Sequence, residues 1–135
     1  LLAVEIQETI KNASTFDELQ PYANTLLENL GLVQKVIGTL MPHAMKGNYE
    51  RFLADATVFM DFFSTIVIGW QWLKTATSAK ELLKNKSGIE LDTFYESKVH
   101  TMKFFYIYEM SRTKGLAKTI MNTEGLTINA SKDMF

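Results

Sequence analysis

The stretch "ATVFMDFFSTIVIGWQWL", residues 56–73, is the most apolar part of the chain, and Asp61 is its only charged residue. Its apolar side chains fall into two heptad-spaced sets, which predicts a helix covered on two faces by neighbouring helices. The uncharged part, residues 62–73, is shorter than the about 20 residues that cross a bilayer, so we interpret it as a buried bundle helix. We expect the helix to run from about residue 49 to residue 84. The two sets are Phe52, Ala56, Phe59, Phe63, Ile66, Trp70 and Leu73, and Val58, Phe62, Gly69, Trp72, Ala76 and Ala79.

The residues before this helix predict two others. Residues 1–13 repeat apolar side chains at helical spacing and predict a short helix. The next helix begins either at a capping box formed by Thr15 and Glu18 or near Pro21, because proline is favoured in a first helical turn. Pro42 is expected to stop or kink this helix. Its apolar stripe consists of Leu26, Leu27, Leu30, Val33, Ile37 and Leu40.

The residues after the central helix predict one more. "NKSGIELDT", residues 85–93, is interpreted as a loop, because Ser-Gly at 87–88 breaks helices. A helix is expected from residue 92 or 93 to residue 121. Five consecutive apolar residues, 104–108, point all the way round that helix, so we expect it to be covered on more than one side. Its stripe consists of Tyr95, Val99, Met102, Tyr106, Met110, Thr113, Ala117 and Ile120.

Together these elements predict an all-α fold, an antiparallel bundle of three long helices with a short N-terminal helix. No stretch alternates convincingly as a strand, and residues 122–135 have no amphipathic period and are expected to form an extended tail. A chain of 135 residues with 47% hydrophobic and 21% charged residues suits a single domain, residues 1–135, with one core. Because the first residue is leucine, we expect the chain to be a piece of a longer one; trimming of a tag is the alternative.

The charges are balanced overall but divided between the two halves. The formal net charge is −1, so no global field attracts nucleic acid, and no nucleic-acid partner is expected. Residues 1–73 carry four basic and eight acidic residues, whereas residues 74–135 carry ten and seven. In an antiparallel bundle these halves lie together, which predicts ion pairs between them. A basic face for a partner or an anionic membrane is the alternative.

Cysteine is absent from the chain. Its absence excludes a disulfide framework, a thiolate metal site and a cysteine nucleophile, and it favours a reducing compartment. The first ten residues contain Glu5 and Glu8 instead of a basic start and an apolar run, so they do not form a signal peptide. The expected location is cytoplasmic.

"PHAMKGN", residues 42–48, loosely matches the H-x-x-K-G pattern of a phosphoryl-accepting histidine. That chemistry needs an exposed histidine in the middle of a helix, whereas Pro42 directly precedes His43 and Asn48 suits the start of another helix. We interpret the stretch as a connection between helices. A free-standing four-helix phosphotransfer or scaffold module that uses His43 is the alternative function.

Two carboxylates are further candidates. Glu96 and His100 form E-x-x-x-H, one residue longer than the Glu-x-x-His of di-iron bundles, so we interpret them as a surface pair instead of a metal site. Asp61 lies among apolar residues, where a carboxylate needs a partner unless it acts as a base. We expect a structural partner on a neighbouring helix, Lys98 or Lys103.

The aromatic residues could stack a ring or bases, but Trp70, Trp72 and residues 104–108 recur at helical spacing without a basic groove, which favours core packing. The chain contains no glycine-rich phosphate loop, no G-x-S-x-G and no convincingly spaced catalytic carboxylates. We therefore assign no catalytic, cofactor-binding or metal-ligating residue.

Two segments, 52–76 and 94–121, resemble the C-terminal helical extension of the larger acyl-CoA dehydrogenases. The resemblance rests on spaced alanines and phenylalanines over 52–63 and on Gly69 beside Trp70 and Trp72. It also rests on an F-Y-x2-K motif followed by an aromatic patch. It is strongest over residues 47–125 and extends back to about residue 15. The residues of the motif and patch are Phe94, Tyr95, Lys98, Phe104, Phe105 and Tyr106.

The resemblance implies a flavin enzyme as the parent. Such an enzyme removes two hydrogens across the α–β bond of an acyl-CoA thioester to give the trans-2-enoyl product, and FAD passes the electrons to an electron-transfer flavoprotein. The catalytic glutamate, the flavin contacts and the acyl-CoA pocket of the family lie in the preceding dehydrogenase core. No such residue is carried over to this chain, so FAD is implied for the parent and no cofactor for this domain.

The resemblance also implies a packing role. An extension that docks on the dehydrogenase core or on a second subunit would cover the surplus apolar surface of the two central helices. In some long-chain members the extension is associated with membranes. Residues 74–86, with four lysines and one glutamate, are the segment that could serve this here, but they are short, and no membrane partner is expected.

Overall fold

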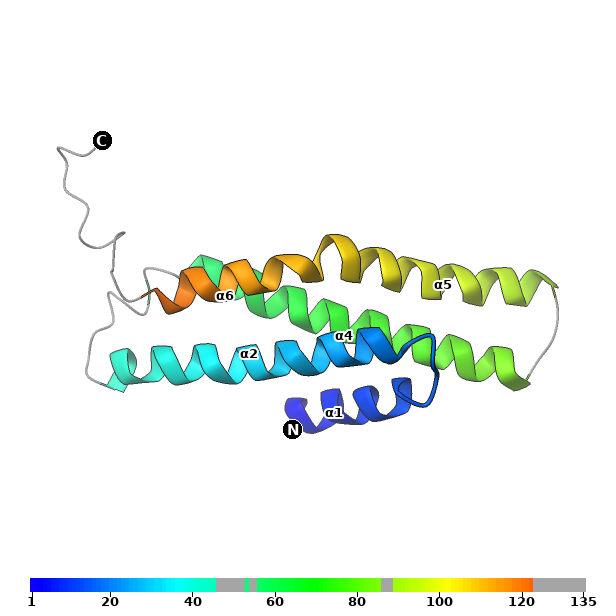
Figure 1. Cartoon of the computed structure of the whole chain (residues 1–135), viewed down its shortest axis with the longest axis horizontal. Coiled ribbons are helices and arrows are strands. Elements are labelled where there is room, and N and C mark those ends of the chain that lie inside the picture. The colour runs from blue at the N-terminus through cyan, green and yellow to red at the C-terminus, as the bar shows by residue number, and fades with distance from the viewer. Residues whose placement is uncertain (46–52, 54–55, 86–88, 123–135) are drawn as a thin grey trace.

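The computed structural model describes residues 1–45, 53, 56–85 and 89–122, without the side chains of 43–45, 85 and 89–91. The described part is an all-α bundle without strands, which confirms the predicted fold class (Figure 1). α2 and α4 are antiparallel, α5 and α6 return along α4, and α1 packs against α2 and α4 (Figure 1). The elements are α1 (Leu2–Ala13), α2 (Gln20–Met45), α4 (Ala56–Asn85), α5 (Ile89–Tyr108), the 3₁₀ turn η1 (Met110–Arg112) and α6 (Thr113–Met121).

α4 is the central helix and packs against α1, α2, α5 and α6. Both of its predicted sets contribute to the core, so the expectation of two covered faces is confirmed where the residues are described. Phe52 and the expected helix start near residue 49 lie outside the described residues. The buried apolar residues of α4 are Phe62, Ile66, Trp70, Leu73, Ala76 and Ala79.

By length and composition α4 could cross a membrane, since residues 56–84 form one long apolar helix with a mean hydropathy of 1.2 in its most apolar window. A third of the residues in that window, 33%, are buried inside the bundle. The core helix of a soluble bundle passes the same test. The test therefore does not separate a membrane helix from the packed helix seen here.

The start of α2 agrees with the Pro21 alternative and contradicts the capping box. α2 begins at Gln20, which places Pro21 in its first turn, where the missing N–H has no helical partner to lose. The Thr15 hydroxyl instead donates to the carbonyl of Asn12 at 2.7 Å, and Ser14 donates to Ile10 at 2.7 Å. These hydroxyls satisfy carbonyls at the end of α1, so they terminate one helix without starting the next.

Pro42 does not stop α2, which continues for three residues to Met45. A proline removes one backbone hydrogen bond, but the carbonyls before it still accept from the residues that follow. The expectation that the helix stops at Pro42 was therefore wrong.

The fourth predicted helix is longer at its start and interrupted near its end. α5 begins at Ile89, within the expected loop. The chain then leaves the α-helix at Glu109 and forms η1 before α6. The Thr113 hydroxyl donates to the Met110 carbonyl at 2.9 Å and supports this tight turn.

The interruption does not disturb the core stripe. Every predicted stripe residue from Val99 to Ile120 is buried, and Tyr95 at the start is partly buried. The expected tail, apart from Asn122, lies outside the described residues.

Candidate functional site

The described residues do not place either histidine in a reactive site. The backbone of His43 lies in the last turn of α2, near its end, and its side chain is outside the described residues. That position does not support the mid-helix site of a phosphotransfer module. His100 is exposed on α5, and the neighbouring Glu96 contacts Lys80 at 3.5 Å. The described residues contain no cluster of three or more metal-ligating side chains.

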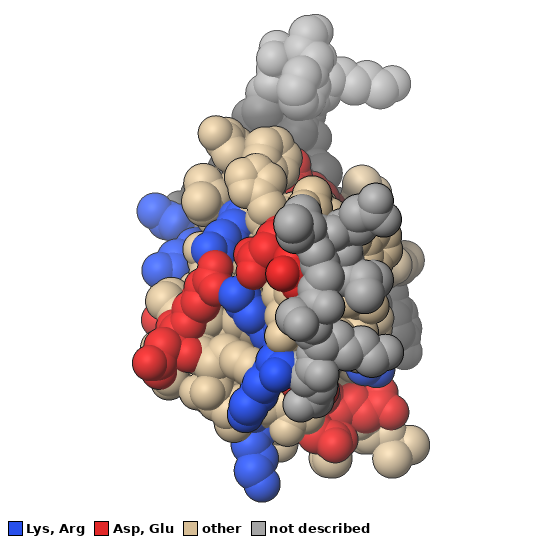
Figure 2. Space-filling model, turned by 90° about the vertical axis from the view of Figure 1, so that its right-hand side faces the viewer, with Lys and Arg blue, Asp and Glu red and all other residues tan. Residues whose placement is uncertain are grey.

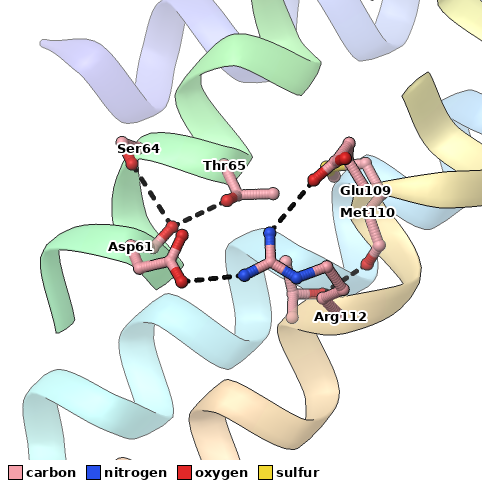
Figure 3. A network of polar contacts seen from close by, with 7 residues as sticks. Asp61, Ser64, Thr65, Glu109, Met110 and Arg112 are labelled. Atoms are coloured by element: carbon pink, nitrogen blue, oxygen red, sulfur yellow. Dashed lines mark hydrogen bonds and ion pairs between the residues drawn. The ribbon is translucent and has the colours of Figure 1, made fainter. Parts of the chain in front are cut away.

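Asp61 pairs with Arg112, so the expected partners Lys98 and Lys103 were wrong (Figure 3). The Arg112 guanidinium donates to the Asp61 carboxylate at 2.8 Å and to Glu109 at 3.0 Å. Glu109 and Arg112 flank the interruption between α5 and α6, so the network ties that turn to α4. All three side chains are nearly half exposed, which makes this a structural ion pair of modest strength instead of a buried base.

Glu18 is the centre of a second ionic cluster. It forms ion pairs with Lys80 of α4 and Lys103 of α5, the latter at 2.6 Å. The hydrogen bonds from Lys103 and Lys80 hold the pKa of Glu18 below its ordinary value of 4.5. Figure 2 shows acidic and basic side chains intermixed over one end of the bundle. Because Glu18 and Asp61 pair with bases of residues 74–135, the predicted attraction between the halves is confirmed.

The middle of the bundle joins four elements around Gly69, which we name the Gly69 layer (Thr9, Gly69, Trp70, Tyr106 and Met110). The buried Trp70 indole donates to the Thr9 hydroxyl at 2.9 Å, which fixes α1 on α4. The Tyr106 hydroxyl donates to the Gly69 carbonyl at 2.8 Å, which fixes α5 on α4. A Cβ on Gly69 would lie 2.5 Å from the Met110 sulfur, so a methyl group there would displace the Met110 side chain.

The Gly69 layer is structural. Burial raises the pKa of Tyr106, so its hydroxyl stays protonated as a donor. The Tyr22 ring lies edge-on to Tyr106, with 5.6 Å between centroids. Trp70 and Tyr106 therefore pack in the core, and their polar tips have partners. This outcome agrees with the predicted core packing for Trp70 and Tyr106.

The apolar run at 104–108 is covered on one side only, which contradicts the expectation for it. Phe104, Ile107 and Tyr108 are 56%, 61% and 61% exposed, and the rings of Phe104 and Tyr108 contact each other at a centroid distance of 4.5 Å. We name these three residues the α5 outer face. Within the described residues nothing packs over them, so this face is available for a partner.

A second apolar surface lies between the end of α2 and the start of α4, which we name the end cavity. It has a volume of about 460 Å³, and none of its described lining residues has a charged or polar side chain. Met41 and Met60 are half exposed at its margin. The lining residues are Ile37, Leu40, Met41, Ala56, Phe59 and Met60.

Three of the hollows have linings that do not suit FAD. The described lining of the end cavity offers no polar side chain for a pyrophosphate. The hollow between α1 and α4 is bordered by Glu5, Glu8 and Glu81, whose carboxylates repel phosphates. The groove between α4 and α5 is formed by the sides of helices, whose backbone N–H groups are already bonded and cannot cradle phosphates. These three surfaces therefore suit contacts with other protein better than a flavin.

These features define a class: an all-α bundle whose described surfaces suit contacts with other protein. Compared with known protein families, the chain matches the family described as "Acetyl-CoA dehydrogenase C-terminal like" over residues 2–130. The match covers almost the whole chain, and the chain belongs to this family of C-terminal domains of acyl-CoA dehydrogenase-like proteins. No curated protein and no solved structure matches it significantly.

Proposed function

We propose that this chain is a non-catalytic packing domain of an acyl-CoA dehydrogenase, which covers the dehydrogenase core of the same chain or a second subunit. The observation that carries the proposal is the α5 outer face, where three large apolar side chains are more than half exposed. Membership of the C-terminal domain family supports a dehydrogenase core as the partner. Burial of Phe104, Ile107 and Tyr108 against such a core would remove about 1.5–3 kcal/mol of unfavourable exposure per side chain.

We infer the parent reaction by analogy with the family. The parent would remove two hydrogens from an acyl-CoA thioester with FAD as the acceptor and pass the electrons to an electron-transfer flavoprotein, in the cytoplasm. This domain would contribute stability and subunit geometry to that reaction. Its residues would not touch the substrate or the flavin.

The test uses the longer chain that carries this domain and the double variant Phe104→Gln/Ile107→Gln. We expect a lower melting temperature or a smaller oligomer, because the substitution places amides in a dry interface. In the 135-residue chain the same two substitutions should change the free energy of unfolding by less than about 0.5 kcal/mol, because both side chains are exposed there.

The matched control is Val4→Gln/Leu27→Gln, which replaces two similarly exposed apolar residues on α1 and α2. It should leave the longer chain unchanged if the interface lies on α5. Unchanged melting and mass of the Phe104→Gln/Ile107→Gln protein would refute the packing role of this face.

A further inference from the structure

A groove runs between α4 and α5 on the outside of the bundle, which we name the α4–α5 groove. Its volume is about 360 Å³, and none of its nine described lining residues carries a carboxylate. The lining combines two lysines and several hydroxyl or amide groups with apolar side chains. The lining residues are Gln71, Lys74, Thr75, Ser78, Ala79, Leu82, Phe94, Tyr95 and Lys98.

The lysines of this region fall into two pairs. Lys80 and Lys103 share the carboxylate of Glu18, and Lys80 also contacts Glu96. Lys74 and Lys98 have no carboxylate within 4 Å among the described residues; their ammonium groups lie 5.6 Å from the Trp70 ring and 5.0 Å from the Phe94 ring. An exposed cation–π contact is weak, so both ammonium groups are available to an incoming carboxylate.

The shape of the groove favours a helix over a small ligand. From Gln71 to Leu82 it follows α4 for about three turns, roughly 16 Å. A small-molecule pocket encloses about 70–90% of its ligand, whereas this groove is open along its length. Leu82 and Phe94 are exposed apolar residues in the groove, and an amphipathic helix could cover them with its apolar stripe.

We propose that the α4–α5 groove binds an acidic amphipathic helix of a protein partner, whose carboxylates pair with Lys74 and Lys98 and whose apolar side chains cover Leu82 and Phe94. The partner supplies the charge that the groove lacks. This inference rests on the proposed packing function only in choosing a protein as the occupant.

An anionic membrane fits the same region less well. Recognition of anionic lipids takes clusters of about 4–8 cations, and this groove has two. Lys74 also borders the hollow that contains Glu5, Glu8 and Glu81, which would repel a broad anionic surface. A helix confined to the groove avoids those carboxylates.

The experiment titrates the 135-residue chain with a synthetic amphipathic helix of about 18 residues that carries glutamates beside a leucine stripe. We expect binding that weakens as salt is added, because the attraction is between exposed charges. Lys74→Glu/Lys98→Glu should lower the affinity about tenfold or more, and Lys74→Gln/Lys98→Gln should lower it less. Circular dichroism verifies that each variant keeps its helices.

The matched control is Lys11→Glu/Lys35→Glu, which changes the net charge equally through two exposed lysines of α1 and α2. Its affinity for the peptide should stay within about twofold of the wild-type affinity. Equal losses in the control and groove variants, or no binding of the peptide, would overturn the proposal. Binding of phosphatidylserine vesicles through Lys74 and Lys98 without binding of the peptide would overturn it in favour of a membrane. None of these results tests the α5 outer face, so the packing function stands or fails separately.

Discussion

The Gly69 layer and the end cavity both include apolar residues of α4, but they differ in hydrogen bonding and in packing. In the Gly69 layer the Trp70 and Tyr106 side chains each donate a buried hydrogen bond, and Gly69 has no room for a methyl group. The end cavity has no polar partner and is about 460 Å³ in volume. The comparison shows that the middle of α4 holds the fold together, whereas its start leaves apolar surface uncovered.

The largest expected effect contrasts two truncations on α4. Leu73→Ala should destabilise the chain by about 2–5 kcal/mol, because Leu73 is fully buried and its removal leaves a cavity. Met60→Ala at the end cavity should cost less than about 0.5 kcal/mol, because Met60 is already 59% exposed. Chemical denaturation measures both. Similar losses would abolish the distinction between the two regions.

Thr9→Val tests the hydrogen bond that joins α1 to α4. The substitution keeps the shape but leaves the buried Trp70 N–H without an acceptor, so we expect a loss of about 1–3 kcal/mol. Thr39→Val on the exposed side of α2 is the control, since Thr39 bonds only within its own helix. If both variants unfold at the same denaturant concentration, the Trp70 bond contributes nothing.

Gly69→Ala tests the close approach of η1. Displacing the Met110 side chain in the packed core should cost about 1–3 kcal/mol, and the better helix propensity of alanine returns about 0.5–1, so a net loss of about 0–2.5 kcal/mol is expected. Gly31→Ala should instead stabilise the chain by about 0.5–1 kcal/mol, because nothing lies within 4 Å of its new methyl group. Effects of equal sign would contradict the crowding at Gly69.

The smallest effect concerns Glu18, outside both regions. Because its pKa in the folded chain is below 4.5, its ion pairs stabilise the fold above that pH and are lost as the pH falls through the lower value. Glu18→Gln should therefore cost up to about 1 kcal/mol at pH 7, and less as the pH falls below 4.5, since the cluster is partly exposed. A difference from wild type that persists at pH 2 would point to packing in place of charge.

The sequence predicted the bundle because the core stripes obey the helical period over many turns. The stripe from Val99 to Ile120 is buried throughout, although the helix breaks at Glu109 within it. The spacing of apolar residues shows which side chains face the core. It does not show where the backbone hydrogen bonds change from the α-helical pattern, which reaches the fourth preceding residue, to the 3₁₀ pattern, which reaches the third. That is why the stripe was correct and the continuous helix was not.

Pairings between distant polar groups were less predictable. Asp61 was expected to find a lysine on a neighbouring helix, but the break in the last helix brings Arg112 to it instead. Thr15 and Glu18 match a capping box in spacing, yet Thr15 completes α1 and Glu18 reaches two lysines of α4 and α5. These pairings depend on how the helices pack against each other. The spacing of residues along one helix does not predict that packing.

The hydrogen bond between Thr9 and Trp70 also sets an order of events during synthesis. Within the bundle α1 is made before α4, and the indole that bonds to Thr9 follows 61 residues later. At about 5–20 residues per second, this contact has to wait roughly 3–12 s for its partner. Since a 12-residue helix is marginal alone, α1 gains the stability of this hydrogen bond only after α4 has been made.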